Sequence, residues 1–258
     1  MIDEIKQELT RLENDHDIKI LLAVESGSRA WGFASTDSDW DVRYIYVHRL
    51  DWYLKIDNLK DSQEEILPND IDLAGWELKK ALRLFRKSNP PMLEWLRSPI
   101  VYLEQFSTAQ RLRELSGQFF SPRSGMYHYL SMAKNNFREF LQRDVVRTKK
   151  YFYVLRPVLA CEWIKERGSF PPMEFDQLVE AQVTDATVRG EIEQLLEIKI
   201  AGGELGEGQR NKILNEYLET KISYFSNYVD EMEANKKPAT ELLDDVVRLT
   251  IQEAWAEV

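Results

Sequence analysis

The chain begins with apolar residues at helical spacing and continues with two strand-forming runs. Residues 2–15 place apolar side chains three and four positions apart with charged residues between them, which predicts an amphipathic helix. Residues 18–24 are almost entirely apolar and rich in strand-forming types, so they predict a buried central strand. Residues 42–47 predict a second strand. Between the two strands we expect a turn and then a short helix over residues 29–34.

The rest of the pattern is mixed at first and then helical. Up to residue 117 it predicts helices over residues 76–85, 92–97 and 103–115 and a short strand over residues 100–103. Residues 117–125 contain Pro122 and two glycines and are the clearest candidate for a domain boundary. The helices expected after this boundary span residues 125–143, 147–167, 174–182, 186–200, 209–233 and 239–256. A pair of glycines, Gly202 and Gly203, and then Gly206 break the chain between two of them.

These elements predict an α+β protein in two parts. Residues 1–117 combine strands with flanking helices, and residues 118–258 form an all-helical C-terminal domain. A chain of 258 residues is long enough for one large or two small domains. Its hydrophobic content of 43% is sufficient for a substantial core.

The composition argues against a secreted or membrane-spanning protein. No run of about 18 apolar residues is present, and the acidic, helical N-terminus does not resemble a signal peptide. The single cysteine, Cys161, lies in an apolar stretch and is expected to be a buried thiol. Together these features favour the cytoplasm. The chain has 34 basic and 44 acidic residues, a net charge of −10, which disfavours sequence-independent nucleic-acid binding but allows a local basic cleft.

Residues 24–43, around the turn between the first two predicted strands, contain the candidate catalytic and binding residues. Gly27 and Ser28 leave the backbone bare at a turn, where exposed N–H groups can hold a phosphate. Asp39 and Asp41 are two residues apart, so on a strand their carboxylates point to the same face. Two carboxylates on one face repel each other unless a cation lies between them. Oxygen ligands of this kind suit Mg²⁺ with substrate phosphates, so the stretch predicts a nucleoside triphosphate site.

The spacing of these residues resembles a known family motif. Residues 27–41 read Gly-Ser-x-Ala-x-Gly-x-Ala-x-x-x-Ser-Asp-x-Asp, which is similar to the nucleotidyltransferase motif of the DNA polymerase beta superfamily. The resemblance implies a catalytic domain built on a small mixed sheet with flanking helices, and Mg²⁺ or Mn²⁺ as cofactor. It assigns Asp39 and Asp41 to the metal. Within the motif, Arg29 and Ser38 join Gly27 and Ser28 as expected phosphate contacts.

The superfamily resemblance also implies a third carboxylate on a neighbouring strand. Ile71-Asp72-Leu73 is similar to that step, so the resemblance assigns Asp72 as a metal ligand and as acceptor of the proton of the attacking hydroxyl. Asp70 would share the same face of a strand and is the rival candidate. A third possibility is that Asp72 caps the following helix.

Arg43 lies two residues beyond Asp41 and shares its face if the strand is regular. It can form a salt bridge to the aspartates, or it can contact and orient a phosphate. Both interpretations remain open at this stage.

A local excess of basic residues in residues 134–156 stands against the acidic total of the chain. Seven basic residues share this stretch with two acids and with interleaved aromatic side chains, so such a surface could hold phosphate charge and stack a base. A solvated helix face over core aromatics is the alternative. The stretches 88–90, 94–99 and 149–157 are similar to nucleotidyltransferases associated with RNA ligases and RNA repair, the RlaP or YcgL type. Within that family Lys149, Tyr153 and Arg156 are candidates for nucleotide contact.

The residues and the resemblance together predict transfer of a nucleoside monophosphate from an NTP to an acceptor hydroxyl. The family context implies an RNA 3′ end as acceptor and RNA-repair proteins as possible partners. A protein or small-molecule hydroxyl, a nucleotide-binding module without turnover, and a scaffold role remain alternatives. No spacing of histidine and cysteine indicates a zinc site.

Overall fold

The computed structural model describes residues 1–201, 206–233 and 239–256. The chain divides into two compact units. The first, here called the sheet unit, comprises Met1–Ala30, Asp39–Phe119 and Lys237–Val258. The second, the helical unit, comprises Trp31–Ser38 and Phe120–Lys236.

The sheet unit combines five strands with six helices among its described residues. In chain order they are α1 (Ile2–His16), β1 (Ile18–Glu25), β2 (Trp40–His48), α2 (Leu50–Tyr53), β3 (Ser62–Ile66), β4 (Ile71–Glu77), α3 (Leu78–Arg86), α4 (Pro90–Trp95), β5 (Val101–Glu104), α5 (Thr108–Phe119) and α11 (Glu241–Trp255). The strands form one sheet in the order β3-β4-β2-β1-β5. Strands β2 and β4 are parallel and the other neighbours are antiparallel, so the sheet is mixed.

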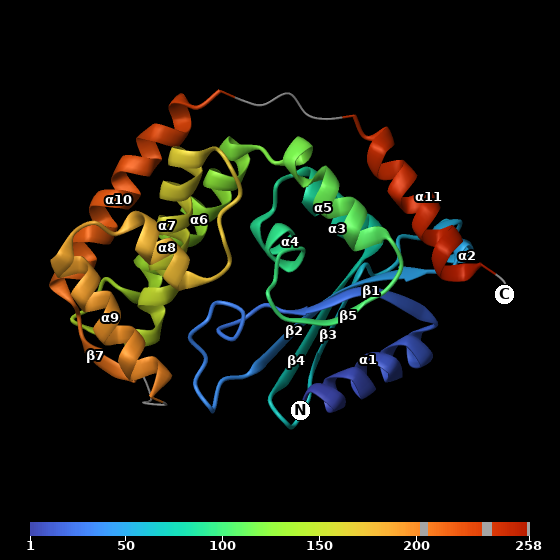
Figure 1. Cartoon of the computed structure of the whole chain (residues 1–258), viewed down its shortest axis with the longest axis horizontal. Coiled ribbons are helices and arrows are strands. Elements are labelled where there is room, and N and C mark those ends of the chain that lie inside the picture. Colours follow the sequence, from blue (N-terminus) through green and yellow to red (C-terminus); the bar gives the residue numbers. More distant parts are fainter. Residues whose placement is uncertain (202–205, 234–238, 257–258) are drawn as a thin grey trace. The chain divides into compact units, whose positions relative to one another are not determined.

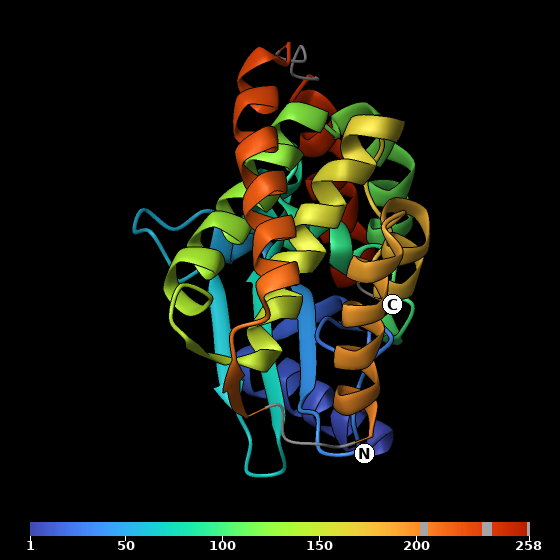
Figure 2. The same ribbon diagram turned by 90° about the vertical axis from the view of Figure 1, so that its left-hand side faces the viewer.

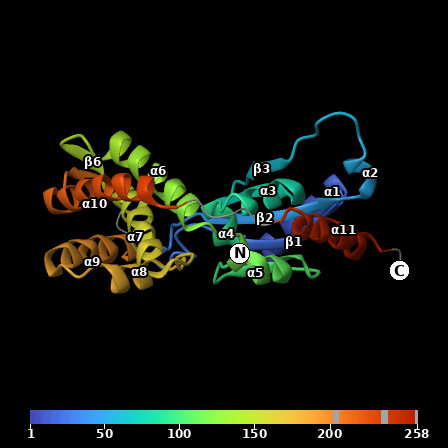
Figure 3. The ribbon, with the colours of Figure 1, turned by 90° about the horizontal axis from the view of Figure 1, so that it is seen from above.

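Helices cover both faces of this sheet. Helix α1 lies on one face, and α3, α5 and α11 lie on the other (Figure 1). The periodic apolar residues of α1, Ile5, Leu9 and Leu12, are fully buried against the sheet. Strand β3 forms one edge of the sheet, and residues 54–61 lead to it from α2 (Figure 3). The predicted α+β class with a small mixed sheet is confirmed.

The last helix, α11, belongs to the sheet unit although it follows the helical unit in sequence. The indole N–H of Trp255 donates to the carbonyl oxygen of His48 at 2.9 Å. Two residues earlier on the same helix, the carboxylate of Glu253 accepts the hydroxyl of Ser107 at 2.6 Å. The sequence pattern predicts a domain boundary after residue 117, with all later residues in one domain. In the structure α11 belongs to the sheet unit, and residues 31–38 belong to the helical unit.

His48, at the end of β2, is expected to make stability depend on pH. Its ring stacks on Trp52 with centroids 4.3 Å apart, and burial lowers the pKa of the imidazole from 6.5 to about 4. The charge of Asp17 opposes this shift, and those of Lys55 and His16 add to it. Because the unfolded chain takes up the proton first, this contribution to stability is complete above pH 6.5 and is lost as the pH falls towards 4. An NMR titration of the imidazole should give a midpoint near 4, and His48→Gln should lose less stability over this range.

The helical unit is not wholly helical, which corrects the all-helical prediction. Its described elements are α6 (Pro122–Phe140), β6 (Val145–Arg147), η1 (Thr148–Tyr151, a 3₁₀ helix), α7 (Phe152–Arg167), α8 (Phe175–Gln182), α9 (Ala186–Ile200), β7 (Glu207–Gln209) and α10 (Lys212–Glu231). The two short strands pair antiparallel, with Val146 opposite Gly208. Because β7 lies some sixty residues after β6, local periodicity could not reveal this pairing. The predicted break at Gly202 and Gly203 lies outside the described residues.

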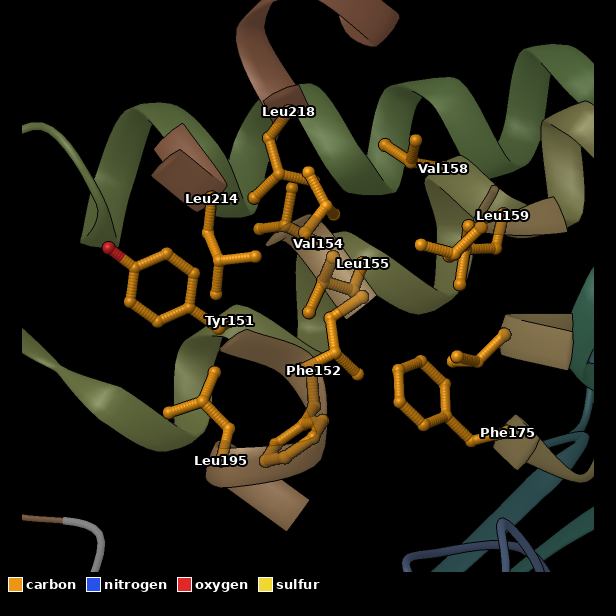
Figure 4. Packing of buried hydrophobic residues seen from close by; sticks show 14 of the residues in the cluster. Tyr151, Phe152, Val154, Leu155, Val158, Leu159, Phe175, Leu195, Leu214 and Leu218 are labelled. Carbon is orange, nitrogen blue, oxygen red and sulfur yellow. The ribbon is translucent and has the colours of Figure 1, made fainter. Parts of the chain in front are cut away.

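The core of the helical unit is built around α7. Helix α10 runs alongside α6 and α7 (Figure 2), and side chains from these helices and from α8 and α9 interdigitate about α7 (Figure 4). Cys161 of α7 is fully buried, as predicted, and burial raises the pKa of its thiol. None of the helices in the described part of the chain has the length and apolar character needed to cross a membrane.

The connection between β1 and β2 departs most from the expected local structure. Residues 29–32 form turns and residues 33 and 34 are irregular, instead of the predicted helix. Gly32 adopts a positive φ of 88°, which a right-handed helix excludes. Residues 31–38 are instead held by the helical unit. Phe33 is buried and stacks on Phe152 with centroids 4.7 Å apart, and the Trp31 carbonyl accepts the N–H of Phe175 at 2.9 Å.

Candidate active site

The turn after β1 is organised by a buried glutamate, Glu25. Its Oε1 accepts the backbone N–H of Gly27 at 3.2 Å and that of Asp41 at 3.0 Å. Its Oε2 accepts the hydroxyl of Tyr102 at 2.5 Å, and burial, reinforced by this hydrogen bond, raises the pKa of that hydroxyl. The side chain therefore ties the end of β1 to the start of β2 and to β5. Sequence reasoning assigned Glu25 no role; the available signal was one carboxyl group directly after an apolar run, residues 20–24.

Gly27 is required for a steric reason. A Cβ atom at this position would lie 1.7 Å from Oδ2 of Asp41 and 2.6 Å from its Cγ. The absence of a side chain thus creates the space that the Asp41 carboxylate occupies. The N–H of Gly27, which the sequence assigned to a phosphate, already donates to Glu25 in this structure.

Asp41 and Asp72 are brought together by strand register. Strands β2 and β4 run parallel with Asp41 directly opposite Asp72. Side chains of paired residues point to the same face, so two carboxylates separated by thirty residues of sequence become neighbours. Both are about one-third exposed, with side-chain exposures of 30% and 35%.

The guanidinium of Arg43 holds these two carboxylates. Its Nη2 lies 3.0 Å from Oδ1 of Asp41 and 2.7 Å from Oδ2 of Asp72. Its Nη1 donates to the carbonyl oxygens of Asp72 at 2.8 Å and Val42 at 3.1 Å. Of the two interpretations of Arg43, the ion pair is therefore the one formed in this structure. The arginine supplies the positive charge that two adjacent carboxylates require.

The surroundings of Asp41 raise the pKa of its carboxyl group. Burial raises the pKa of Asp41 above its usual range, and the positive charge of Arg43 opposes that effect. The negative charges of Glu25, Asp72 and Asp39 each raise this pKa further. Negative charge thus converges on Asp41 beyond what a single arginine neutralises.

Asp39 lies just before β2 and is exposed. Its carbonyl oxygen accepts Nε of Arg29 at 3.2 Å, and the guanidinium of Arg29 lies 3.8 Å from the ring centroid of Trp40. Ser28 is half-buried in the turn that follows Gly27. The sheet unit therefore carries Gly27, Ser28, Arg29, Asp39, Asp41, Arg43 and Asp72 of the predicted site.

The structure separates Asp72 from its two alternatives. Asp70 lies in the turn before β4 with a positive φ of 60°, and its carbonyl oxygen accepts the N–H of Trp40 at 2.8 Å. The residue that caps α3 is Glu77, whose carboxylate accepts the N–H of Lys79 at 2.8 Å. Asp72 is in the interior of β4 and does not cap the helix; its side chain lies beside Asp41 and is paired with Arg43.

The donor chemistry of this site fits a hard divalent cation. Asp41 and Asp72 offer carboxylate oxygens on one face of the sheet, as Mg²⁺ and Mn²⁺ prefer. Among the residues that the structure describes, no three histidine, cysteine, aspartate or glutamate side chains form a ready metal-binding group. The ion pair to Arg43 would have to rearrange for a metal to contact both carboxylates.

The remaining predicted site residues belong to the helical unit. The hydroxyl of Ser38 lies 3.0 Å from that of Ser35 and accepts Nζ of Lys199 at 3.3 Å. Arg156 is 3% exposed, and its Nε donates to a backbone carbonyl. Tyr153 is 42% exposed, and Lys149 is exposed. The role of these residues in nucleotide contact stays a prediction.

Comparison with known proteins agrees with the motif. The family model described as the RNA repair pathway DNA polymerase beta family, RlaP, matches residues 1–249. The uncharacterized protein YcgL of Bacillus subtilis (strain 168) is 46% identical over 257 residues, which cover 100% of this chain and 99% of that protein. A crystal structure of a nucleotidyltransferase-like protein from Exiguobacterium sibiricum 255-15 aligns with 88% of this chain and 74% of its own at 12% identity, but its TM-score of 0.35 is too low to support any inference. The resemblance found in the sequence is confirmed: the chain belongs to the RlaP family of the RNA repair pathway.

Proposed function

We propose that this protein is a metal-dependent nucleotidyltransferase that moves an NMP from an NTP to an acceptor hydroxyl, with an RNA 3′ end as the acceptor. The observation that supports the proposal most directly is the pairing of Asp41 with Asp72 next to the Gly27 turn. Membership of an RNA repair family supports the choice of acceptor.

The residues of the sheet unit have distinct roles in this reaction. Ser28 and Arg29 bind the triphosphate at the turn, where a hydroxyl and a guanidinium can meet phosphate oxygens. Asp72 accepts the proton of the acceptor hydroxyl on a carboxylate oxygen. The acceptor oxygen then forms a bond to the α-phosphorus while the bond to the β-phosphate oxygen breaks, and pyrophosphate leaves.

Asp39, Asp41 and Asp72 are the residues that would hold Mg²⁺ or Mn²⁺. When bound, such an ion supplies positive charge that stabilises the attacking and leaving oxygens. The backbone N–H of Asp41 donates a hydrogen bond to Glu25, and the absence of a side chain at Gly27 leaves space for the Asp41 carboxylate; both features fix Asp41 for this task. Tyr102 in turn holds the Glu25 carboxyl group in place.

Transfer of label from each α-³²P-labelled NTP tests this function. The acceptor pool contains RNA with free 3′ hydroxyls, small metabolites and the protein itself, with Mg²⁺ or Mn²⁺ present. Label on RNA that disappears in Asp39→Ala/Asp41→Ala is the expected result. Label on protein or on a metabolite would identify a different acceptor, and bound NTP without any transfer would indicate a nucleotide-binding module.

Two matched variants distinguish the two candidate third carboxylates. Asp72→Asn should lower the transfer rate at least about 100-fold, as loss of a positioned proton acceptor does. Asp70→Asn should keep most of the activity, because asparagine tolerates the positive φ at that turn and the carbonyl bond to Trp40 does not involve the side chain. Equal losses in both variants would contradict the assignment of Asp72.

Arg43→Ala is expected to strengthen metal binding. In the wild type a metal must displace the Arg43 guanidinium, which bridges both carboxylates. Charged hydrogen bonds of this kind contribute about 1.5–3 kcal/mol. Removing the competitor should tighten Mn²⁺ binding by about tenfold. Titration followed by electron paramagnetic resonance measures this directly, without turnover. Asp41→Asn is the control and should weaken Mn²⁺ binding; weaker binding in Arg43→Ala as well would show that the arginine supports the metal.

A further inference from the structure

Aromatic and cationic side chains alternate along one part of the helical unit, here called the aromatic strip: Phe140, Lys150, Tyr153 and Trp31. Nζ of Lys150 lies 4.0 Å from the ring centroid of Phe140 and 4.7 Å from that of Tyr153. Tyr153 meets Trp31 edge-on with centroids 5.9 Å apart. Tyr153 is 42% exposed, and the other two rings are half-buried.

Positive charge collects around the strip. Lys149 and Arg147 are exposed and lie close enough to Lys150 to act on it: burial lowers the pKa of Lys150, and these two charges lower it further. Glu139 opposes the shift but does not reverse it. None of the three cations takes part in an ion pair with any residue that the structure describes.

A second exposed lysine–tyrosine pair in the same unit shows the contrast. Nζ of Lys165 lies 4.6 Å from the ring centroid of Tyr224, which is 44% exposed. Hydrogen bonding to Tyr224 raises the pKa of Lys165, and the charge of Glu162 adds to that increase. The lysine at this site therefore has its charge compensated, whereas Lys150 faces further cations. The two tyrosine rings are thus similarly exposed, but the pKa values of their lysine neighbours are shifted in opposite directions.

Arg156 supports the strip from the interior. Its guanidinium lies 4.8 Å from the ring centroid of Trp31, and the residue is buried with Nε bonded to the Met173 carbonyl at 3.4 Å. A side chain in this position is suited to fix the Trp31 ring.

We propose that the aromatic strip binds the single-stranded RNA acceptor, with bases stacked on its exposed aromatic surface and phosphates near Lys149 and Arg147. This inference rests on the proposed function. The exposed Tyr153 ring can stack one base while the exposed cations beside it meet the phosphates of neighbouring nucleotides, which suits a single strand. In a chain with a net charge of −10, a strand of phosphates requires such a local concentration of cations.

The test measures binding of a fluorescent single-stranded RNA of about 12 nucleotides to the full chain by anisotropy. Tyr153→Ala should weaken binding roughly 5- to 100-fold, the range for loss of one stacked base. Lys149→Gln should reduce the slope of log K against log salt concentration by about 0.7. The matched control is Tyr224→Ala, which removes an equally exposed tyrosine and should leave binding within about twofold of the wild type. Thermal unfolding of each variant confirms that it is folded.

Unchanged binding in Tyr153→Ala would overturn the proposal, as would an equal loss in Tyr224→Ala or equal affinity for an RNA duplex, whose bases are not free to stack. Displacement of the RNA by ATP alone would indicate that the aromatic strip binds the NTP instead. The variant Asp39→Ala/Asp41→Ala separates this proposal from the proposed function, because it should bind RNA normally without transfer. RNA binding that needs Tyr153 in a wild-type protein without transferase activity would refute only the proposed function. An unchanged rate of transfer to RNA in Tyr153→Ala would refute only the RNA-binding role of the aromatic strip.

Discussion

Gly27→Ala is expected to lower the proposed nucleotidyl transfer on the order of 100-fold while the protein remains folded. The added Cβ would lie 1.7 Å from Oδ2 of Asp41, far inside van der Waals contact. The obstructing atoms are the end of a side chain, so the conflict is relieved by moving the carboxylate and not by unfolding the sheet. A catalytic group displaced by about 1 Å costs on the order of 100-fold in rate. Single-turnover transfer of label measures this loss, and circular dichroism reports the fold.

Gly117→Ala provides the matched control in the same unit. Gly117 lies within α5, and a Cβ there would meet nothing within 4 Å. Because alanine is favoured over glycine in a helix interior by about 1 kcal/mol, this variant should be slightly more stable and fully active. Near-normal transfer in Gly27→Ala would mean that the position of the Asp41 carboxylate does not limit the reaction.

Glu25→Ala is expected to cause a large loss of stability in the sheet unit. The side chain is 0% exposed, and it accepts hydrogen bonds from the amides of Gly27 and Asp41 and from the hydroxyl of Tyr102. Alanine would leave these three donors without their acceptor in a buried site. Removing the acceptor from such a buried set of hydrogen bonds lowers the free energy of unfolding by about 3–5 kcal/mol. Urea unfolding, followed by tryptophan fluorescence, measures the change in the free energy of unfolding.

Two milder variants show whether hydrogen bonding is the cause. Glu25→Gln keeps the volume and one acceptor oxygen, but it turns an NH₂ group towards existing donors, so an intermediate loss is expected. Tyr102→Phe removes one donor only and should cost about 1.5–3 kcal/mol. Combining the two should cost less than the sum of the separate effects, because they share one bond. A loss below about 1 kcal/mol in Glu25→Ala would contradict the organising role of this residue.

Local sequence patterns were sufficient for much of the sheet unit. The buried strand β1 and the amphipathic helix α1 follow from apolar runs and helical spacing, and both lie where the pattern predicted. In contrast, strand β3 was missed. It is a half-exposed edge strand, so its residues carry little of the hydrophobic alternation on which prediction depends.

The candidate site was predicted in part. The motif indicated Asp41 and Gly27 because their spacing within one turn is a property of the sequence. The resemblance favoured Asp72 over Asp70, but that Asp72 stands directly opposite Asp41 depends on the register between β2 and β4. That register is a long-range pairing, and a shift by one residue would have turned the other face of the strand to the site.

What the sequence determined by itself was the family and the α+β class, because motif spacing and the order of apolar patterns are properties of the sequence. Tertiary structure alone decided that Arg43 bridges two carboxylates and that Glu25 is bonded to Tyr102, 77 residues away. It also placed residues 31–38 with the helices and α11 with the sheet. The physical reason is that burial of Phe33 or hydrogen bonding of Glu253 depends on partners distant in sequence, which no local pattern encodes.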